Sequence, residues 1–218
     1  MAHQTRRWWI CLLIVLFTVT LSLARIAAQT DAETESWARV PDILKALDAQ
    51  PGSSIADVGA GDGFYAVRIA RAVLPGGRVV GEDISESAVQ KIRDRVAADR
   101  LTNVDVVLGA VDDPRLADSA FDAVLVHNAY HEFEKHEQML EHILKALKPG
   151  GRFVLVEPFH DSTSSLPRDQ QVAKHDLAAD IAEKELRLAG FTIKERDDKF
   201  VRFVAGDPGG FWMIVARK

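Results

Sequence analysis

A strand pattern that runs directly into a glycine-punctuated turn most constrains the fold of this chain. Residues 55–65 read IADVGAGDGFY, in which a short apolar strand pattern precedes glycines at positions 59, 61 and 63 and then a helical pattern. Glycine has no Cβ, so it adopts positive φ in a tight turn and lets the backbone approach a ligand at the strand end. The segment predicts a strand, loop and helix that bind a nucleotide-type cofactor.

The spacing of these glycines separates two kinds of cofactor. A dinucleotide-binding turn has the pattern GxGxxG, whereas this loop reads GxGxG and has Phe64 where the third glycine would stand. Asp57 and Asp62, beside the loop, suit a ligand with an ammonium or sulfonium group better than one with phosphates. An NAD(P)-dependent oxidoreductase is therefore the last-ranked hypothesis.

Helical and strand patterns alternate along the rest of the chain, which is typical of a parallel sheet with helices on both faces. We expect strands at residues 54–58, 78–83, 104–108, 121–126, 151–157, 192–197 and 210–216. We expect helices at residues 37–49, 63–73, 86–99, 135–147 and 167–189.

Three more segments follow the glycine loop in a distinctive order. Gly81-Glu82-Asp83-Ile84-Ser85 ends the second strand, FDAVLV at 121–126 forms the fourth, and LKPGG at 147–151 makes the turn before the fifth. Together with residues 57–63 they resemble the class I S-adenosylmethionine-dependent methyltransferases over residues 40–218. The resemblance implies an α/β fold, a three-layer Rossmann-like sandwich. Its seven-stranded, mostly parallel sheet has an antiparallel last strand inserted between the fifth and sixth. The cofactor it implies is S-adenosyl-L-methionine.

The cofactor residues are expected beyond the carboxyl ends of the strands, where ligands bind in such sheets. The glycine loop should line the methionine part, with Asp57 below it holding the amino group. Asp83 should accept the ribose hydroxyls, with Glu82 as its rival, because a one-residue register decides which side chain faces the ligand. The predicted set is Asp57, Gly59, Ala60, Gly61, Gly63, Glu82, Asp83, Val111, Asp112 and His127.

Adenine recognition is expected after the third strand. Val111 offers a backbone amide and Asp112 a carboxylate, although Asp112 could equally cap the next turn. Ala110 departs from the Asp or Asn that is common at this position in the family.

The segment 127–133, HNAYHEF, concentrates functional side chains after the fourth strand. Methyl transfer is an in-line displacement, so the protein mainly aligns the acceptor and supplies a base. His127 and His131 are the catalytic candidates, and for each one a purely structural role in the loop is an equal alternative. The residues predicted to contact the acceptor are Asn128, Tyr130, Glu157, His160 and His175.

A metal site is not predicted. His131-Glu132 followed by His136 reads HExxxH, one residue too long to place both imidazoles on one helical face. Cys11 is the only cysteine and lies in the N-terminal apolar run, so thiol chemistry is excluded from the rest of the chain.

The N-terminus has the pattern of an export signal. Arg6 and Arg7 precede an apolar run at residues 8–24, and small residues lead to a cleavage site near Ala28. We expect residues 1–29 to be a signal peptide or membrane anchor, 30–36 a linker and 37–218 the methyltransferase-like domain. The domain would then be periplasmic, extracellular or anchored by the N-terminus, in conflict with a cytoplasmic cofactor.

The sequence thus predicts a methyltransferase that acts on a small or medium-sized acceptor. The net charge of −5 disfavours a nucleic-acid partner, which would need a basic face. The alternative is an exported, non-catalytic domain of the same fold that binds an adenosine-like ligand or a protein. The acceptor and the oligomeric state stay open.

Overall fold

The computed structural model describes residues 31, 34–35, 38–202 and 209–218 of the 218-residue chain. Contacts divide the chain into two units, Met1–Arg39 and Val40–Lys218, and the fold below is that of the second unit. The predicted signal or anchor at residues 1–29 lies outside the described residues. Among those described, no helix is both long and apolar enough to cross a membrane.

A seven-stranded sheet forms the centre of the second unit, in the order β3-β2-β1-β4-β5-β7-β6. β7 runs antiparallel to both neighbours, and the other pairs are parallel. The predicted fold class is confirmed, including the antiparallel strand between the fifth and sixth. The strands are β1 (Ser54–Val58), β2 (Arg78–Asp83), β3 (Val104–Leu108), β4 (Phe121–His127), β5 (Leu147–His160), β6 (Thr192–Arg202) and β7 (Gly209–Arg217).

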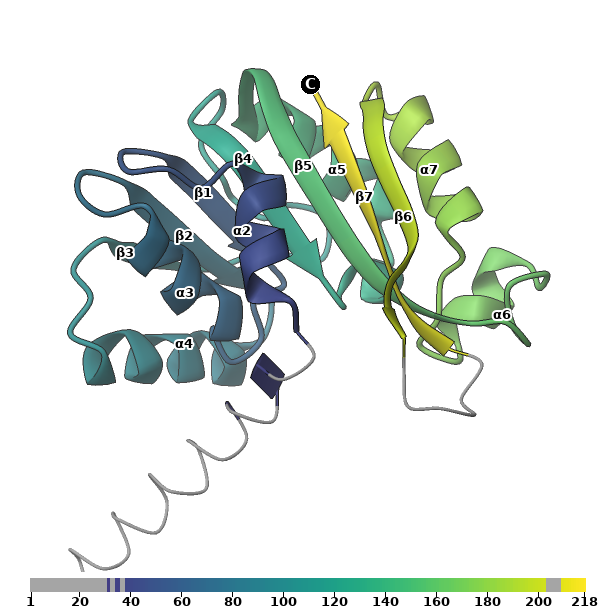
Figure 1. Cartoon of the computed structure of the whole chain (residues 1–218), viewed down its shortest axis with the longest axis horizontal. Helices are drawn as coiled ribbons and strands as arrows, with labels where there is room; N and C mark the ends of the chain where they lie inside the picture. Colours follow the sequence, from purple (N-terminus) through teal and green to yellow (C-terminus); the bar gives the residue numbers. More distant parts are fainter. Residues whose placement is uncertain (1–30, 32–33, 36–37, 203–208) are drawn as a thin grey trace, which may run out of the picture. The chain divides into compact units, whose positions relative to one another are not determined.

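Helices cover both faces of this sheet (Figure 1). On one face lie α2 (Val40–Leu47), α3 (Phe64–Ala72) and α4 (Glu86–Ala98). On the other lie α5 (His136–Ala146) and α7 (Ala179–Leu188), with the short α6 (Arg168–Val172) near the end of β5. A single 3₁₀ turn, η1 (Tyr130–Glu132), follows β4.

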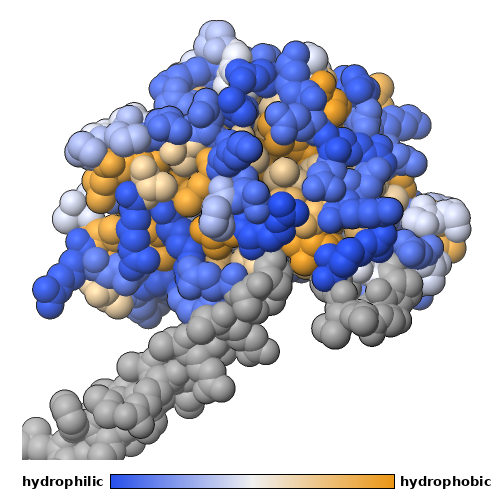
Figure 2. All heavy atoms as spheres, viewed as in Figure 1, coloured by the Kyte–Doolittle hydropathy of each residue, from blue (hydrophilic) through white to orange (hydrophobic). Residues whose placement is uncertain are grey.

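Apolar side chains of the central strands hold the three layers together. Every residue of β4 from Ala123 to Val126 is fully buried, as expected for a parallel strand covered on both faces. Leu140 and Ile143 of α5 and Ile214 of β7 join the same core. Each such side chain contributes about 1.5–3 kcal/mol by leaving water. On the face drawn in Figure 2, hydrophilic residues surround smaller apolar areas.

The single helix predicted at residues 167–189 is wrong, because the chain breaks into α6 and α7. Gln171 is buried, and its amide group donates to the carbonyl oxygens of Ser164 and Leu166 and accepts from the Ala178 amide. These bonds hold a tight turn, in which His175 adopts a φ of 57°. His175, a predicted acceptor contact, therefore lies in the turn between α6 and α7.

The fifth strand starts earlier than predicted. Leu147 already pairs with Phe121, and the register of β5 against β4 shifts before Ala123 pairs with Arg152. The predicted LKPGG turn is therefore an irregular beginning of β5, in which Gly150 has a φ of 75°.

Candidate active site

A cavity of about 180 Å³ opens at the carboxyl ends of the strands. Parallel pairing aligns these ends, since Val58 lies opposite Glu82 of β2 and Val126 of β4. The lining residues come from the loops after β1 to β4 and from the start of α5. They are Gly59, Gly61, Glu82, Asp83, Ile84, Ala110, Val111, Asn128, Ala129, Glu132, Phe133, Glu134 and Met139.

The glycine loop forms one wall, and its backbone requires glycine. Gly59, Gly61 and Gly63 have φ values of 69°, 58° and 82°, in the left-handed region. A Cβ on Gly59 would lie 2.5 Å from the Cβ of Ala129, so the loops after β1 and β4 touch at this point. Gly59 and Gly61 line the cavity, whereas Ala60 and Gly63 do not.

Two neighbouring acids of β2 accept hydrogen bonds from amides of the glycine loop. One Asp83 oxygen accepts from the Gly61 amide at 3.0 Å, and the other accepts from the Ser85 amide at 2.9 Å. Glu82 Oε2 accepts from the Gly59 amide at 3.3 Å. Both side chains line the cavity, so the structure brings both ribose candidates to it.

Glu82 and Asp57 are buried acids at the floor of the loop. Burial raises the pKa of Glu82 to about 8, and Asp83 and Asp57 add to the shift, while the Gly59 amide opposes it. Burial likewise raises the pKa of Asp57 to about 7. Within the described part of the chain, Glu82 Oε1 and Asp57 Oδ2 have no hydrogen-bond partner. Asp57 does not line the cavity.

The carboxylate of Asp62 is paired within the protein, whereas the sequence suggested that it acts on a ligand. Its carboxylate pairs with Arg95 at 2.5 Å and also accepts from the Phe64 amide at 3.0 Å. Arg95 comes from α4 and also donates to the backbone carbonyl of Asp62. The side chain therefore anchors the start of α3 to α4.

Apolar side chains flank the outer part of the cavity. Ile84 is 59% exposed and Val111 is 44% exposed, which is unusual for side chains of this size. The Ala110 amide donates a hydrogen bond to the backbone carbonyl of Asp113 in the turn after β3. Asp112 is exposed and does not line the cavity, so the structure does not place it where adenine recognition was predicted.

His127 is the last residue of the central strand β4 and does not line the cavity. Its ring lies 4.5 Å from that of Tyr65 and 5.5 Å from that of Phe211, and Nε2 pairs with the Tyr65 hydroxyl at 3.1 Å. Burial lowers the pKa of His127 to about 4, so the ring is neutral at pH 7. These contacts are consistent with the structural role that was the alternative to catalysis.

Glu157 organises the loop after β4 from below. This fully buried carboxylate accepts from the amides of Ala129, Tyr130 and His131 at 2.7, 2.8 and 3.1 Å, and from His131 Nδ1 at 2.6 Å. Burial by itself would lower the pKa of His131, but the hydrogen bond to Glu157 and the charges of Glu157, Glu132 and Asp176 together outweigh it, so the pKa is raised. Glu157 is thus not available to an acceptor, contrary to its predicted contact.

The other residues predicted to contact the acceptor lie in different parts of the structure. Asn128 is exposed at the cavity with a φ of 54°. Tyr130 is buried and donates to Glu185 at 2.7 Å, away from the cavity lining. His160 Nδ1 pairs with the buried Asp176 at 2.7 Å. His175 has a side chain that is 77% exposed and lies near Glu132, at 3.9 Å.

Several lining residues were not predicted from the sequence. In the sequence, Ala129 and Met139 have the pattern of ordinary core residues, and Glu134 has the pattern of a solvent-exposed acid. Ile84 carried the one available signal, because it directly follows the ribose candidate Asp83 at a strand end.

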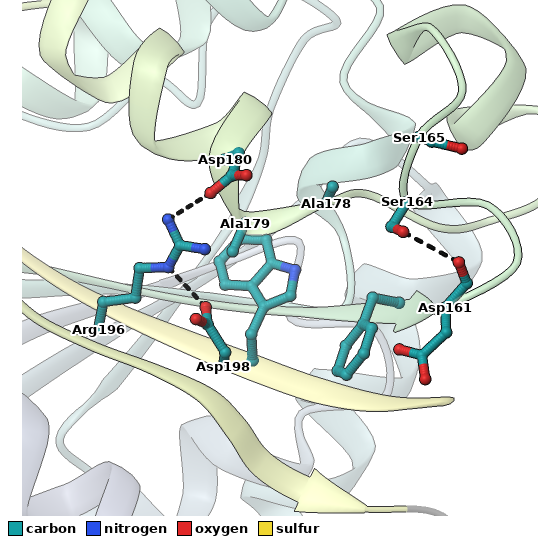
Figure 3. Close-up of a pocket in the computed structure, with 10 residues that line it drawn as sticks. Asp161, Ser164, Ser165, Ala178, Ala179, Asp180, Arg196 and Asp198 are labelled. Carbon is teal, nitrogen blue, oxygen red and sulfur yellow. Dashed lines mark hydrogen bonds and ion pairs between the residues drawn. The ribbon is translucent and has the colours of Figure 1, made fainter. Parts of the chain in front are cut away.

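A second cavity, of about 280 Å³, lies against β6, β7 and the start of α7. Figure 3 shows the Arg196 guanidinium between the carboxylates of Asp180 and Asp198, at 2.7 and 2.5 Å. Glu183 binds the same group at 3.0 Å, so the charge of Arg196 is matched within the protein. None of the residues predicted for the site lines this cavity.

Comparison with known proteins identifies the family. A family model described as a methyltransferase domain matches residues 49–204, most of the chain. The chain belongs to this methyltransferase family. The predictions of a class I methyltransferase and of S-adenosyl-L-methionine as cofactor are thereby confirmed, and the oxidoreductase and non-catalytic alternatives are not favoured.

Individual relatives agree with this assignment. The chain is 36% identical to a 37.1 kDa protein in transposon TN4556 of Streptomyces fradiae, over 67% of this chain and 41% of the relative. It is 32% identical to the demethylmenaquinone methyltransferase of Shouchella clausii, over 56% of this chain and 52% of the relative. The matches thus span about half the length of these relatives.

Among solved structures, a SAM-dependent methyltransferase from Aquifex aeolicus has the same fold. It superimposes with a TM-score of 0.70 at 20% identity, covering 85% of this chain and 92% of that chain.

Proposed function

We propose that this methyltransferase-family chain transfers the methyl group of S-adenosyl-L-methionine to a small-molecule acceptor, with the cofactor in the 180 Å³ cavity. One observation carries the proposal. The left-handed glycine loop and the acids of β2 meet at the carboxyl ends of adjacent parallel strands, where ligands bind in open α/β sheets.

The lining residues fit the parts of the cofactor in order. Gly59 and Gly61 expose backbone to the methionine part. Each Asp83 oxygen already accepts one amide hydrogen and retains lone pairs for the ribose hydroxyls. The exposed apolar side chains of Ile84 and Val111 suit the two sides of an adenine ring.

Charge in the cavity floor also fits this cofactor. Glu82 Oε1 is a buried acceptor without a partner among the described residues, and it lies in the cavity wall. A buried unpaired acceptor is costly unless a ligand supplies a donor. The ammonium and sulfonium groups of the cofactor would favour the ionised forms of Glu82 and Asp57.

The acceptor side is the loop after β4. Neither catalytic candidate lines the cavity, but Asn128 beside His127 and Glu132 beside His131 both do. The pKa of His131 is raised by Glu157, whereas burial lowers the pKa of His127 to about 4. Relatives named for demethylmenaquinone and for arsenite differ in acceptor, so neither acceptor is transferred to this chain.

We also propose that residues 1–29 direct export or anchor the domain, as their basic and apolar pattern suggests. Protease added to intact cells should degrade the domain if it is exported and anchored. Protection from protease that persists in spheroplasts, together with an uncleaved N-terminus by mass spectrometry, would contradict export.

The reaction is tested by S-adenosylhomocysteine formation with a panel of acceptors that offer oxygen, nitrogen, carbon or sulfur. The wild-type chain should form product with one acceptor class, and Asp83→Ala should lower the rate at limiting cofactor. Cofactor binding without turnover on any acceptor would count against methyl transfer. Absence of binding would count against the cofactor as well.

A further inference from the structure

Three side chains with metal-ligating atoms meet at the edge of the cofactor cavity. They are His131, Glu132 and His175, whose ligand atoms all lie within 4.8 Å of one another. His131 Nε2 is 3.7 Å from Glu132 Oε1, and His175 Nδ1 is 3.9 Å from the same oxygen. The two imidazole rings are nearly perpendicular, with centroids 5.6 Å apart.

His131 is held in the orientation that a ligand needs. Its Nδ1 donates to the buried Glu157 at 2.6 Å, which leaves the Nε2 lone pair on the side of Glu132. Metal-binding histidines commonly donate their other ring N–H to a carboxylate in this way, which fixes the tautomer and raises the basicity of the ligand. The side chain of His131 is 3% exposed, so the orientation is enforced by packing.

The local charge also favours a cation. His131 lies between two carboxylates, with Nδ1 2.6 Å from Glu157 and Nε2 3.7 Å from Glu132. Asp176 is itself buried and is held by His160 and Thr163, at 2.7 and 2.8 Å. A divalent ion would therefore meet a cluster of carboxylates around two imidazoles.

Only small side-chain movements are needed to bring the three ligand atoms to metal-binding distances. Two ligands about 2.1 Å from a tetrahedral metal lie roughly 3.4 Å apart, slightly closer than the separations from Glu132 to the two histidines. Glu132 and His175 are 66% and 77% exposed, so their side chains can close this gap. The left-handed backbone at His175 directs the chain back toward the loop after β4.

We propose that His131, Glu132 and His175 bind a divalent transition metal, with zinc as the best match, and that Glu157 is the positioning residue for His131. Two imidazoles and one carboxylate are a ligand set of zinc sites that keep a fourth position open. Imidazole ligands disfavour calcium and magnesium. The sequence argument against a metal considered His136, which in the fold approaches Glu185 at 3.5 Å instead.

A consequence follows for the acceptor, and it rests on the proposed function. Because Glu132 also lines the cofactor cavity, the open position would lie at the cavity edge and could hold an acceptor hydroxyl. Coordination lowers the pKa of the hydroxyl, and its proton leaves to solvent. The oxygen electron pair then forms the bond to the methyl carbon, while the carbon–sulfur pair stays on sulfur to give S-adenosylhomocysteine. His131 would act as a ligand in this scheme and not as the base.

The site is tested on the full-length, tag-free and metal-free chain without cofactor. Co²⁺ is titrated while visible absorption is recorded, and Zn²⁺ is then added in competition. We expect one equivalent of Co²⁺ to give the visible band of a low-coordinate site and Zn²⁺ to displace it. His175→Ala and Glu132→Gln should each weaken affinity at least tenfold. The matched control is His142→Ala, which removes an imidazole that lies beside Asp113 and should change affinity less than twofold.

Absence of the band, or equal affinity in wild type and His175→Ala, would overturn the proposal. Both substituted side chains are exposed, so circular dichroism should show unchanged folding in each variant. Since no cofactor is present, failure of this titration leaves the methyltransferase proposal untouched, and failure of methyl transfer leaves the metal site untouched.

Discussion

The two halves of the site are held together in different ways. The cofactor half, residues 55–63 and 78–85, is fixed mainly by backbone geometry and by carboxylates that accept from nearby loop amides. The acceptor half, residues 127–133 and 157–176, depends on buried side chains that reach across elements, above all Glu157 and Asp176. A local pattern can therefore specify the first half, whereas the second exists only once the fold brings distant residues together.

The largest effect should come from Glu157→Ala in the acceptor half. The substitution leaves three amides and one imidazole N–H without their acceptor in a buried place. At about 1–3 kcal/mol for each group that stays unsatisfied, we expect a loss of about 4 kcal/mol in the free energy of unfolding. Urea unfolding at pH 7 measures it, with the exposed Glu141→Ala as a control that should leave the midpoint nearly unchanged. Equal midpoints in the two variants would remove the special role of Glu157.

Gly59→Ala tests the point where the two halves touch. The new Cβ would lie 2.5 Å from Ala129 at a φ of 69°, so the loops after β1 and β4 must separate. We expect a loss of about 2–3 kcal/mol in stability from strain and overpacking, together with at least tenfold weaker cofactor binding. Gly150→Ala has a similar φ and open space around it, and should cost only about 1 kcal/mol. Similar losses in both variants would show that contact with Ala129 does not matter.

Glu82→Gln tests the buried charge of the cofactor half. The folded-state pKa of about 8 lies above the unfolded value, so the folded protein binds the extra proton and loses relative stability as pH rises from about 4.5 to 8. Glutamine cannot ionise, so the variant should be more stable than wild type at pH 8 by about 1–3 kcal/mol, with little gain at pH 4. Urea unfolding across this range measures the difference. A constant difference at all pH values would contradict the assignment.

Asp62→Asn should have the smallest effect on the ligand. Arg95 already neutralises this carboxylate, so we expect cofactor affinity to change less than about twofold, as measured by calorimetry. A tenfold loss would show that Asp62 acts on the ligand directly and would restore the prediction made from its place beside the loop.

The sequence predicted the sheet, the glycine loop and the two acids of β2 that line the cavity, because their determinants are local. Buried strand patterns, glycines that need positive φ and acids at a strand end each depend on residues close in the chain. The role of Asp112 stayed open because a carboxylate in a polar turn has the same local pattern whether it faces a ligand or solvent.

The acceptor half was harder to predict because its partners are far apart in the sequence. Nothing local shows that Glu157 would hold the loop after β4, or that Gln171 would break a helical pattern. The break between α6 and α7 places His175 near Glu132. No rule of sequence spacing predicts this pair.

Calorimetric titration of S-adenosylhomocysteine into the full-length chain tests the central claim most directly, with Asp83→Ala, Asp112→Ala and His131→Ala alongside. We predict that Asp83→Ala weakens binding at least tenfold, because Asp83 lines the cavity, whereas Asp112→Ala and His131→Ala bind nearly as wild type does. Equal affinity in Asp83→Ala and wild type, or no binding to the wild-type chain, would contradict a cofactor site in this cavity.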